Sequence, residues 1–132
     1  MSQETIDVAR RFETALNAGD DLDTLLTPDF VMVNAATGVT DDTYEGARGI
    51  AQWKNDIFEA FDAVARFELE QIVADGDDFV VTMNRIEGCG ARSGAPLVFR
   101  WAAVLWIRDG KLARVVGYLR RREALKAVGL QE

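Results

Sequence analysis

The chain has 132 residues, 48% of them hydrophobic and 28% charged, which predicts a single globular domain spanning residues 1–132. Its net charge of −7 argues against nucleic-acid binding, because an acidic domain repels the phosphate backbone. Histidine is absent, which excludes imidazole acid–base catalysis and histidine-ligated metal, and we expect neither a metal nor an organic cofactor.

The sequence shows no sign of export or of membrane insertion. Its single cysteine, Cys89, cannot form an intrachain disulfide, so nothing indicates an oxidising compartment. The first residues lack the apolar core of a signal peptide, and no run approaches the ~20 apolar residues of a membrane span. We therefore expect a cytoplasmic protein without membrane partners.

The N-terminal part is predicted to be helical. Apolar residues recur there at three- and four-residue spacing, with Ser2 available as N-cap and Gly19 as the stop. A second, short helix is predicted over residues 20–26, ended by Pro28. A third predicted helix carries an apolar stripe formed by Ile50, Trp53, Ile57 and Phe61.

Strands are predicted for most of the remaining chain. A short strand covers residues 29–35, and a loop follows over 37–46. After the third helix the apolar period changes to two, which predicts strands over residues 65–78, 79–90, 96–110 and 111–121. Asp109-Gly110 predicts a tight hairpin turn between the last two strands. A short helix is predicted over residues 122–130.

This order of elements predicts an α+β fold with three N-terminal helices packed on a curved, mostly antiparallel sheet. On the longest strand one row is apolar throughout and should meet the helices: Leu97, Phe99, Trp101, Ala103, Leu105 and Ile107. The opposite row is mixed and contains Trp106. Either a second copy covers Trp106 in a homodimer, or arginine side chains partly cover it on a monomer.

Three segments carry a family resemblance: "FETALNAGDDLDTLLTPDF", "YEGARGIAQWKNDIFEAF" and "RDGKLARVVGYLRRREALKAVGL". They resemble the SnoaL-like branch of the nuclear transport factor two-like superfamily, and the resemblance extends from Ile6 to Leu130. It implies a conical α+β fold. That fold hosts isomerases, cyclases, epoxide hydrolases, dehydratases, binding proteins and subunits without catalysis.

The resemblance to two catalytic groups implies shape only. Ketosteroid isomerases have a tyrosine where this chain has Phe12 and a general-base aspartate where it has Ala35, so the two named parts of their mechanism are missing. Polyketide cyclases of the SnoaL type use an aspartate, commonly with a histidine nearby. A cyclase built on this chain would need a different acid.

The limonene-type epoxide hydrolases are similar at one motif. Their Arg-x-Asp strand motif falls on Arg85 and Glu87, and their water-holding asparagine falls on Asn34. Their water-binding tyrosine appears as Met32, however, and their second aspartate appears as Arg120. The resemblance therefore implies an incomplete catalytic set.

Arg85 and Glu87 are the first candidates for a site. Alternation puts them on the row of Met83, which we assign to the helix-facing side, with Glu87 as acid or acceptor and Arg85 as its orienting partner. The alternative is a strand end that emerges into solvent. If Tyr118 and Arg120 also face inward, flanking arginines lower the Glu87 pKa, which favours ligand binding over proton donation.

The expected ligand contacts are Phe12, Met32, Trp53, Trp101, Tyr118 and Arg120. Residues such as Phe12, Trp53 and Trp101 are more often core than pocket walls, and Arg120 could equally belong to a solvated arginine run. Glu68 and Glu70 are predicted to lie on the outward face of an edge strand. Asp41 and Asp42 are read as solvated loop acids.

The functional expectation is a protein with a pocket for a small hydrophobic molecule. It would be a cofactor-free acid–base enzyme of the epoxide hydrolase or isomerase type, with Glu87, Arg85 and Asn34 at the polar end of the pocket. The alternative is a ligand-binding, accessory or dimerisation module of the same fold without catalysis. Absence of the isomerase pair and of the hydrolase base speaks for that alternative.

Overall fold

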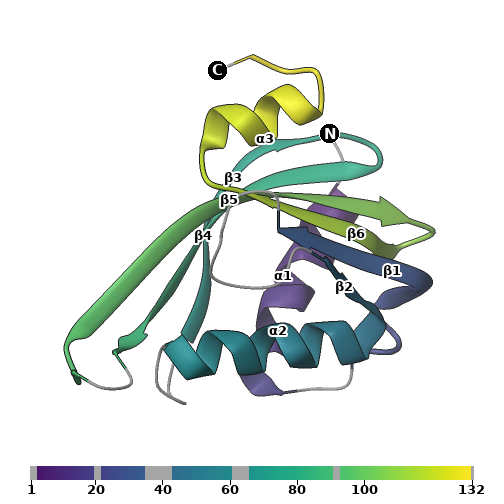
Figure 1. The fold of residues 1–132 in the computed structure, drawn as a ribbon. Helices are drawn as coiled ribbons and strands as arrows, with labels where there is room; N and C mark the ends of the chain where they lie inside the picture. The colour runs from purple at the N-terminus through teal and green to yellow at the C-terminus, as the bar shows by residue number, and fades with distance from the viewer. Residues whose placement is uncertain (1–2, 20–21, 35–42, 61–65, 91–92, 132) are drawn as a thin grey trace.

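A curved sheet organises the fold, with helices on both of its faces (Figure 1). The computed structural model describes residues 3–19, 22–34, 43–60, 66–90 and 93–131. Within these ranges six strands are arranged in the order β2-β1-β6-β5-β4-β3. The elements are α1 (Gln3–Ala18), β1 (Leu26–Asn34), β2 (Thr43–Glu45), α2 (Gly46–Ala60), β3 (Arg66–Asp75), β4 (Phe79–Cys89), β5 (Pro96–Arg108), β6 (Lys111–Tyr118) and α3 (Arg121–Ala127).

The first predicted helix is confirmed as α1. Its buried side chains follow the predicted spacing and include Val8, Phe12 and Leu16. The helix ends where Gly19 adopts a φ of 71° and donates its backbone N–H to the Ala15 carbonyl over 3.0 Å. The proposed N-cap, Ser2, lies outside the described residues.

The second predicted helix is wrong in the part that the structure describes. Leu22 begins a turn, and β1 already starts at Leu26. This backbone is hydrogen-bonded to the sheet instead: the Leu112 N–H of β6 donates to the Leu25 carbonyl over 2.8 Å. Tertiary pairing with β6 therefore outweighs the local helical pattern. The third helix of the described fold is α3 at the C-terminal end.

The predicted strands are confirmed, and so is the turn. Asp109 and Gly110 have φ values of 54° and 75°, as a type I′ hairpin requires between β5 and β6. All strand pairs are antiparallel except β1 and β6, which run parallel. A short strand, β2, forms at the end of the predicted loop, while Asp41 and Asp42 lie outside the described residues.

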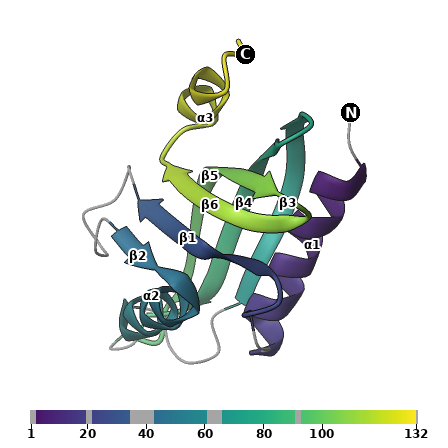
Figure 2. The ribbon, with the colours of Figure 1, turned by 90° about the vertical axis from the view of Figure 1, so that its right-hand side faces the viewer.

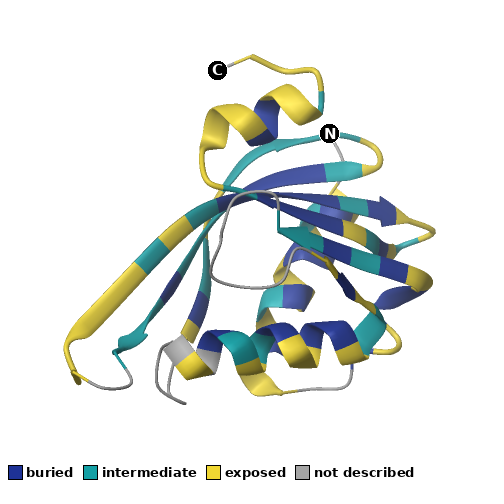
Figure 3. Ribbon diagram, in the orientation of Figure 1, coloured by how far each residue is buried: buried dark blue, intermediate teal, exposed yellow. Residues whose placement is uncertain are grey.

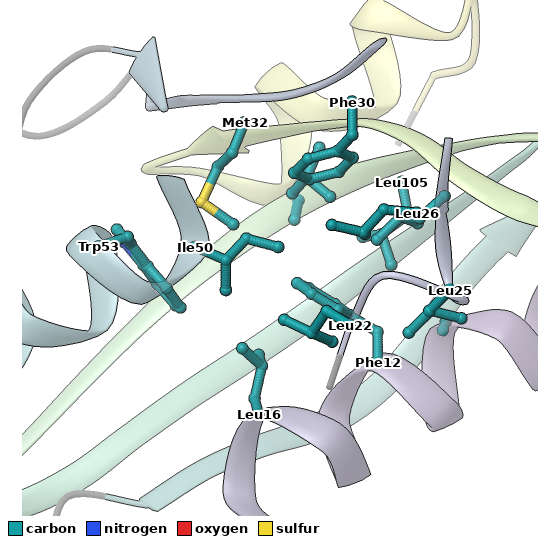
Figure 4. Packing of buried hydrophobic residues seen from close by; sticks show 14 of the residues in the cluster. Phe12, Leu16, Leu22, Leu25, Leu26, Phe30, Met32, Ile50, Trp53 and Leu105 are labelled. Carbon is teal, nitrogen blue, oxygen red and sulfur yellow. The ribbon is translucent and has the colours of Figure 1, made fainter. Parts of the chain in front are cut away.

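The sheet has two covered faces. We call the face covered by α1 and α2 the cavity face, and the opposite face, partly covered by α3, the outer face (Figure 2). The larger cluster of buried side chains fills the space between the cavity face and the two long helices (Figures 3 and 4). Phe12 and Leu16 of α1 and Ile50 and Trp53 of α2 meet in this cluster.

A smaller cluster lies beneath α3 on the outer face. Ala124 and Leu125 of α3 pack there against Val104, and Trp106 is packed against the same cluster. A helix of the same chain therefore covers the apolar patch around Trp106, which neither of the two predicted arrangements included. None of the helices in the described part of the chain is long and apolar enough to cross a membrane.

Candidate ligand-binding site

A cavity of about 50 Å³ lies between α1, α2 and the cavity face of the sheet. Five of the predicted site residues line it together: Phe12, Met32, Asn34, Trp53 and Trp101. The volume is far below the roughly 300–1,000 Å³ of pockets for drug-sized ligands, and it suits a molecule of a few non-hydrogen atoms.

Aromatic rings form one wall of the cavity. The ring centroids of Trp53 and Phe67 are 5.2 Å apart, and those of Trp53 and Trp101 are 6.5 Å apart with an edge-on arrangement. Such tilted contacts are the favoured geometry of aromatic pairs and hold the rings in place. Phe99 extends this group, with its ring centroid 6.0 Å from that of Trp101.

Neutral polar side chains of β4 line the cavity beside these rings. Thr82 is fully buried, and the Asn84 amide donates to its hydroxyl over 2.9 Å. Asn84 lies opposite Trp101 in the β4–β5 register, so the polar pair stands next to the aromatic wall. A hydrogen-bonded amide and hydroxyl can bind a ligand's carbonyl, hydroxyl or N–H group, yet they do not transfer protons near neutral pH.

Gly117 also lines the cavity. It lies opposite Asn34 in the β1–β6 register. A Cβ atom at Gly117 would stand 3.2 Å from Asn34 Oδ1 and 3.7 Å from Trp101 Cδ1. The missing side chain therefore keeps open the space between the asparagine and the indole.

Carboxylates are the charged groups at the cavity. Glu13 and Glu68 are among its lining residues, but the Glu68 carboxylate pairs with Arg85 on the outer face, and in the described part of the chain no lysine or arginine lines the cavity. The Glu13 carboxylate accepts a hydrogen bond from the Leu69 backbone N–H, which fixes it at the edge strand β3. Glu13, Glu68 and Leu69 also line a surface groove that adjoins the cavity, and this groove carries Arg66 and Glu87 as well.

Arg85 and Glu87 lie on the outer face, which corrects their predicted place on the helix-facing row. Val81 and Met83, which share their row, pack in the cluster beneath α3. The intervening row of β4 lines the cavity instead. The prediction failed because helices cover both faces of the strand, so an apolar row does not by itself identify the cavity side.

The Arg85 guanidinium is occupied by carboxylates on the outer face. It forms an ion pair with Glu68 on the neighbouring strand and lies 3.6 Å from Glu87. The hydrogen bond that Arg85 donates to Glu68 raises the pKa of Arg85, although partial burial of the guanidinium opposes the shift. This arrangement is a structural ion pair on a half-exposed surface.

Tyr118 and Arg120 lie outside the cavity as well. Tyr118 pairs with Ala102 on the outer face and packs in the cluster beneath α3. Arg120 is exposed and forms the N-cap of α3, where its backbone N–H donates to Glu123 over 3.2 Å. Of the two readings of Arg120, the solvated one holds, and neither residue lines the cavity.

Sequence reasoning missed the cavity residues Glu13, Phe67, Thr82, Asn84 and Gly117. For Thr82 and Asn84 a signal existed, because two neutral polar residues alternate with apolar ones in the middle of a strand. For Gly117 and Glu13 no local signal points to a site. Their role depends on which strand and which helix face each other across the cavity.

Several solved structures and one domain family are similar to this chain. No protein of curated function matches it in sequence. A Catenulispora acidiphila protein with a ketosteroid isomerase-like fold, crystallised with trimethylamine, is 20% identical, with a TM-score of 0.71 and coverage of 96% of this chain and 95% of that one. A Xanthomonas campestris protein of unknown function with a cystatin-like fold is 23% identical, with a TM-score of 0.68 and coverage of 86% and 88%.

A third structure, a putative SnoaL-like polyketide cyclase from Jannaschia, is 18% identical, with a TM-score of 0.66 and coverage of 89% of this chain and 88% of that one. At these identities the structures show a shared fold. The SnoaL-like domain family itself matches residues 9–115, which is most of the chain. The chain therefore belongs to the SnoaL-like domain family.

Proposed function

We propose that the protein binds a small, largely apolar molecule in the cavity between α1, α2 and the sheet. The observation that carries this proposal is the hydrogen-bonded pair of Thr82 and Asn84, which lies at a cavity lined mostly by apolar residues. Buried polar groups are costly without partners, so a polar pair beside open space suits recognition of a ligand's polar group.

Two further features support binding. Aromatic side chains supply apolar contact area at low entropic cost, and Trp53 and Trp101 both line the cavity. Membership of the SnoaL-like domain family is consistent with a small-molecule function, and the Catenulispora structure was crystallised with trimethylamine. Acid–base catalysis by Glu87 is less favoured, because that carboxylate lies on the outer face beside Arg85.

The test replaces the polar pair by apolar residues of similar size. In a Thr82→Val/Asn84→Leu double variant neither partner is left buried and unpaired, so the fold should survive. We expect affinity for small ketones, alcohols and amines that bind the native protein to fall about fivefold or more, as loss of a hydrogen bond implies. Two-dimensional NMR titration measures the dissociation constants.

The matched control is Glu87→Gln on the outer face of the same strand. It should leave every dissociation constant for these small probes within about twofold of the native value, because Glu87 lines the adjoining surface groove but not the cavity. Unchanged affinity in the double variant would refute the proposed site. Loss of binding in the control would show that Glu87 is part of the ligand site.

We also propose that two copies associate through the part of the outer face that α3 leaves uncovered. Val98 is 52% exposed there, and it pairs with Glu87 in the β4–β5 register. Arg100 lies on the same face and forms an ion pair with Glu70. A patch that carries both signs of charge can complement itself across a twofold axis.

Light scattering tests this association. We expect the mass to approach that of a dimer as the concentration rises, and Val98→Lys to shift the equilibrium towards the monomer by about tenfold, because it places a charge at the apolar centre of the contact. A monomer at every concentration in the native protein would contradict the proposal.

A further inference from the structure

The charges and rings around the cavity point to the chemistry of its ligand. Resting on the function proposed above, we infer that the ligand is a small organic cation, a methylated or otherwise alkylated ammonium. Three independent features of the described residues carry the inference: the sign of the charged groups, the aromatic wall and the size of the cavity.

The charge at the cavity is negative. Glu68 is neutralised by its ion pair with Arg85, whereas Glu13 accepts a backbone hydrogen bond and has no lysine or arginine paired with it among the described residues. With no cation lining the described cavity, a carboxylate or phosphate ligand would meet repulsion from Glu13. A cationic ligand would instead find the counter-charge it needs on leaving water.

The aromatic wall is suited to a cation without strong hydrogen-bond donors. Ring faces carry negative electrostatic potential and attract ammonium groups within about 6 Å of the centroid. Trp53, Phe67 and Trp101 stand together at the cavity, and tryptophan is the strongest partner of this kind. Alkyl groups on the nitrogen also bury apolar surface against the rings, which a primary amine does less well.

The size of the cavity restricts the class further. A volume of about 50 Å³ admits a compact headgroup of a few non-hydrogen atoms, while the adjoining groove allows a longer substituent to lead out past Glu13 and Leu69. A trialkylammonium headgroup with a tail in the groove satisfies both limits. A large planar polycyclic ligand does not.

The experiment compares probes of matched shape and different charge. Tetramethylammonium and tert-butanol have the same number of non-hydrogen atoms and nearly the same outline, and trimethylacetate adds the anionic counterpart. Each is titrated at constant ionic strength, and the indole N–H signals of Trp53 and Trp101 report on the cavity. Trp106, packed on the outer face, is the internal control for unspecific effects.

We expect tetramethylammonium to bind about tenfold more tightly than tert-butanol, from cation–π and carboxylate attraction together, and trimethylacetate to bind most weakly. Glu13→Gln keeps a side-chain carbonyl oxygen for the Leu69 N–H but removes the charge. It should cut the preference for the cation by about threefold or more and leave tert-butanol binding unchanged. Glu59→Gln, at an exposed carboxylate of α2 outside the cavity lining, should change neither.

The outcomes separate the two levels of the proposal. If tert-butanol binds at the cavity as tightly as tetramethylammonium, the cation inference is overturned and the apolar ligand site stands. If trimethylacetate binds most tightly, the assigned sign of the site is wrong. If none of the three probes shifts the signals of Trp53 and Trp101, the proposed binding function fails and the inference fails with it.

Discussion

The two faces of strand β4 differ in a way that explains where this protein can bind a ligand. The cavity face carries Thr82 and Asn84, which are neutral and hydrogen-bonded to each other. The outer face carries Arg85 and Glu87, which are charged and lie 3.6 Å apart. Polar residues thus occur on both faces within the space of six residues, but their chemistry is different.

Exposure to solvent determines whether a face can carry charged or only neutral polar side chains. The side chains of Arg85 and Glu87 are 23% and 46% exposed, so water and counter-charges share the cost of their ionisation. Thr82 is fully buried, where only a neutral group with a hydrogen-bond partner is inexpensive. In β4, neutral polar residues therefore mark the enclosed face, whereas paired charges mark the open one.

The prediction with the largest effect concerns how much the packing of α3 on the outer face contributes to the free energy of unfolding. Leu125 of α3 is buried against the outer face, and Ile86 is buried on the cavity face. We expect Leu125→Ala and Ile86→Ala each to lower the free energy of unfolding by about 2–5 kcal/mol, because both leave cavities. Urea denaturation measures this. A loss well below ~1 kcal/mol for Leu125→Ala would show that α3 only rests on the sheet.

A smaller effect is expected on the cavity face, where Gly117 leaves space for a ligand. Gly117→Ala places a methyl group 3.2 Å from Asn34 Oδ1 and narrows the space beside Trp101. We expect ligand affinity to fall about tenfold, while the free energy of unfolding changes by no more than about 1 kcal/mol, since one methyl group is added. Titration with tetramethylammonium and urea denaturation give the two values. Equal affinity in the variant would mean that the ligand does not approach Gly117.

The prediction with the smallest effect concerns an exposed ion pair between β1 and β5. Arg108 donates to the Asp29 carboxylate over 2.6 Å, and this hydrogen bond, with a second from Thr27, holds the Asp29 pKa below its ordinary value of 3.8. A lowered carboxyl pKa stabilises the fold above pH 3.8, and this contribution is lost as the pH falls through the lowered pKa.

Arg108→Gln should therefore raise the Asp29 pKa towards 3.8, which an NMR pH titration of the carboxyl carbon can follow. Arg100→Gln, which removes the ion pair with Glu70 instead, should leave the Asp29 pKa unchanged. A similar shift in both variants would indicate a general effect of net charge, in conflict with the local hydrogen bond as the cause.

Part of the candidate site could be predicted because it depends on local pattern. Phe12 and Trp53 lie on the apolar faces of their helices, which the helical spacing reveals, and Trp101 belongs to the row of β5 that is apolar throughout. Arg85 could not be placed in this way. The residues of its row are apolar up to Met83, as expected for a row that lines a cavity. These residues are apolar because α3 packs over them, and α3 lies far along the chain.

The helices α1 and α2, the strands β3 to β6 and the hairpin at Asp109-Gly110 follow from local pattern, because periodicity and positive φ preferences act over a few residues. The side of β4 that meets the cavity and the early start of β1, after a turn at residues 22–25, depend on contacts between distant parts of the chain. Alternation divides a strand into two rows, but it does not say which row a distant element will cover.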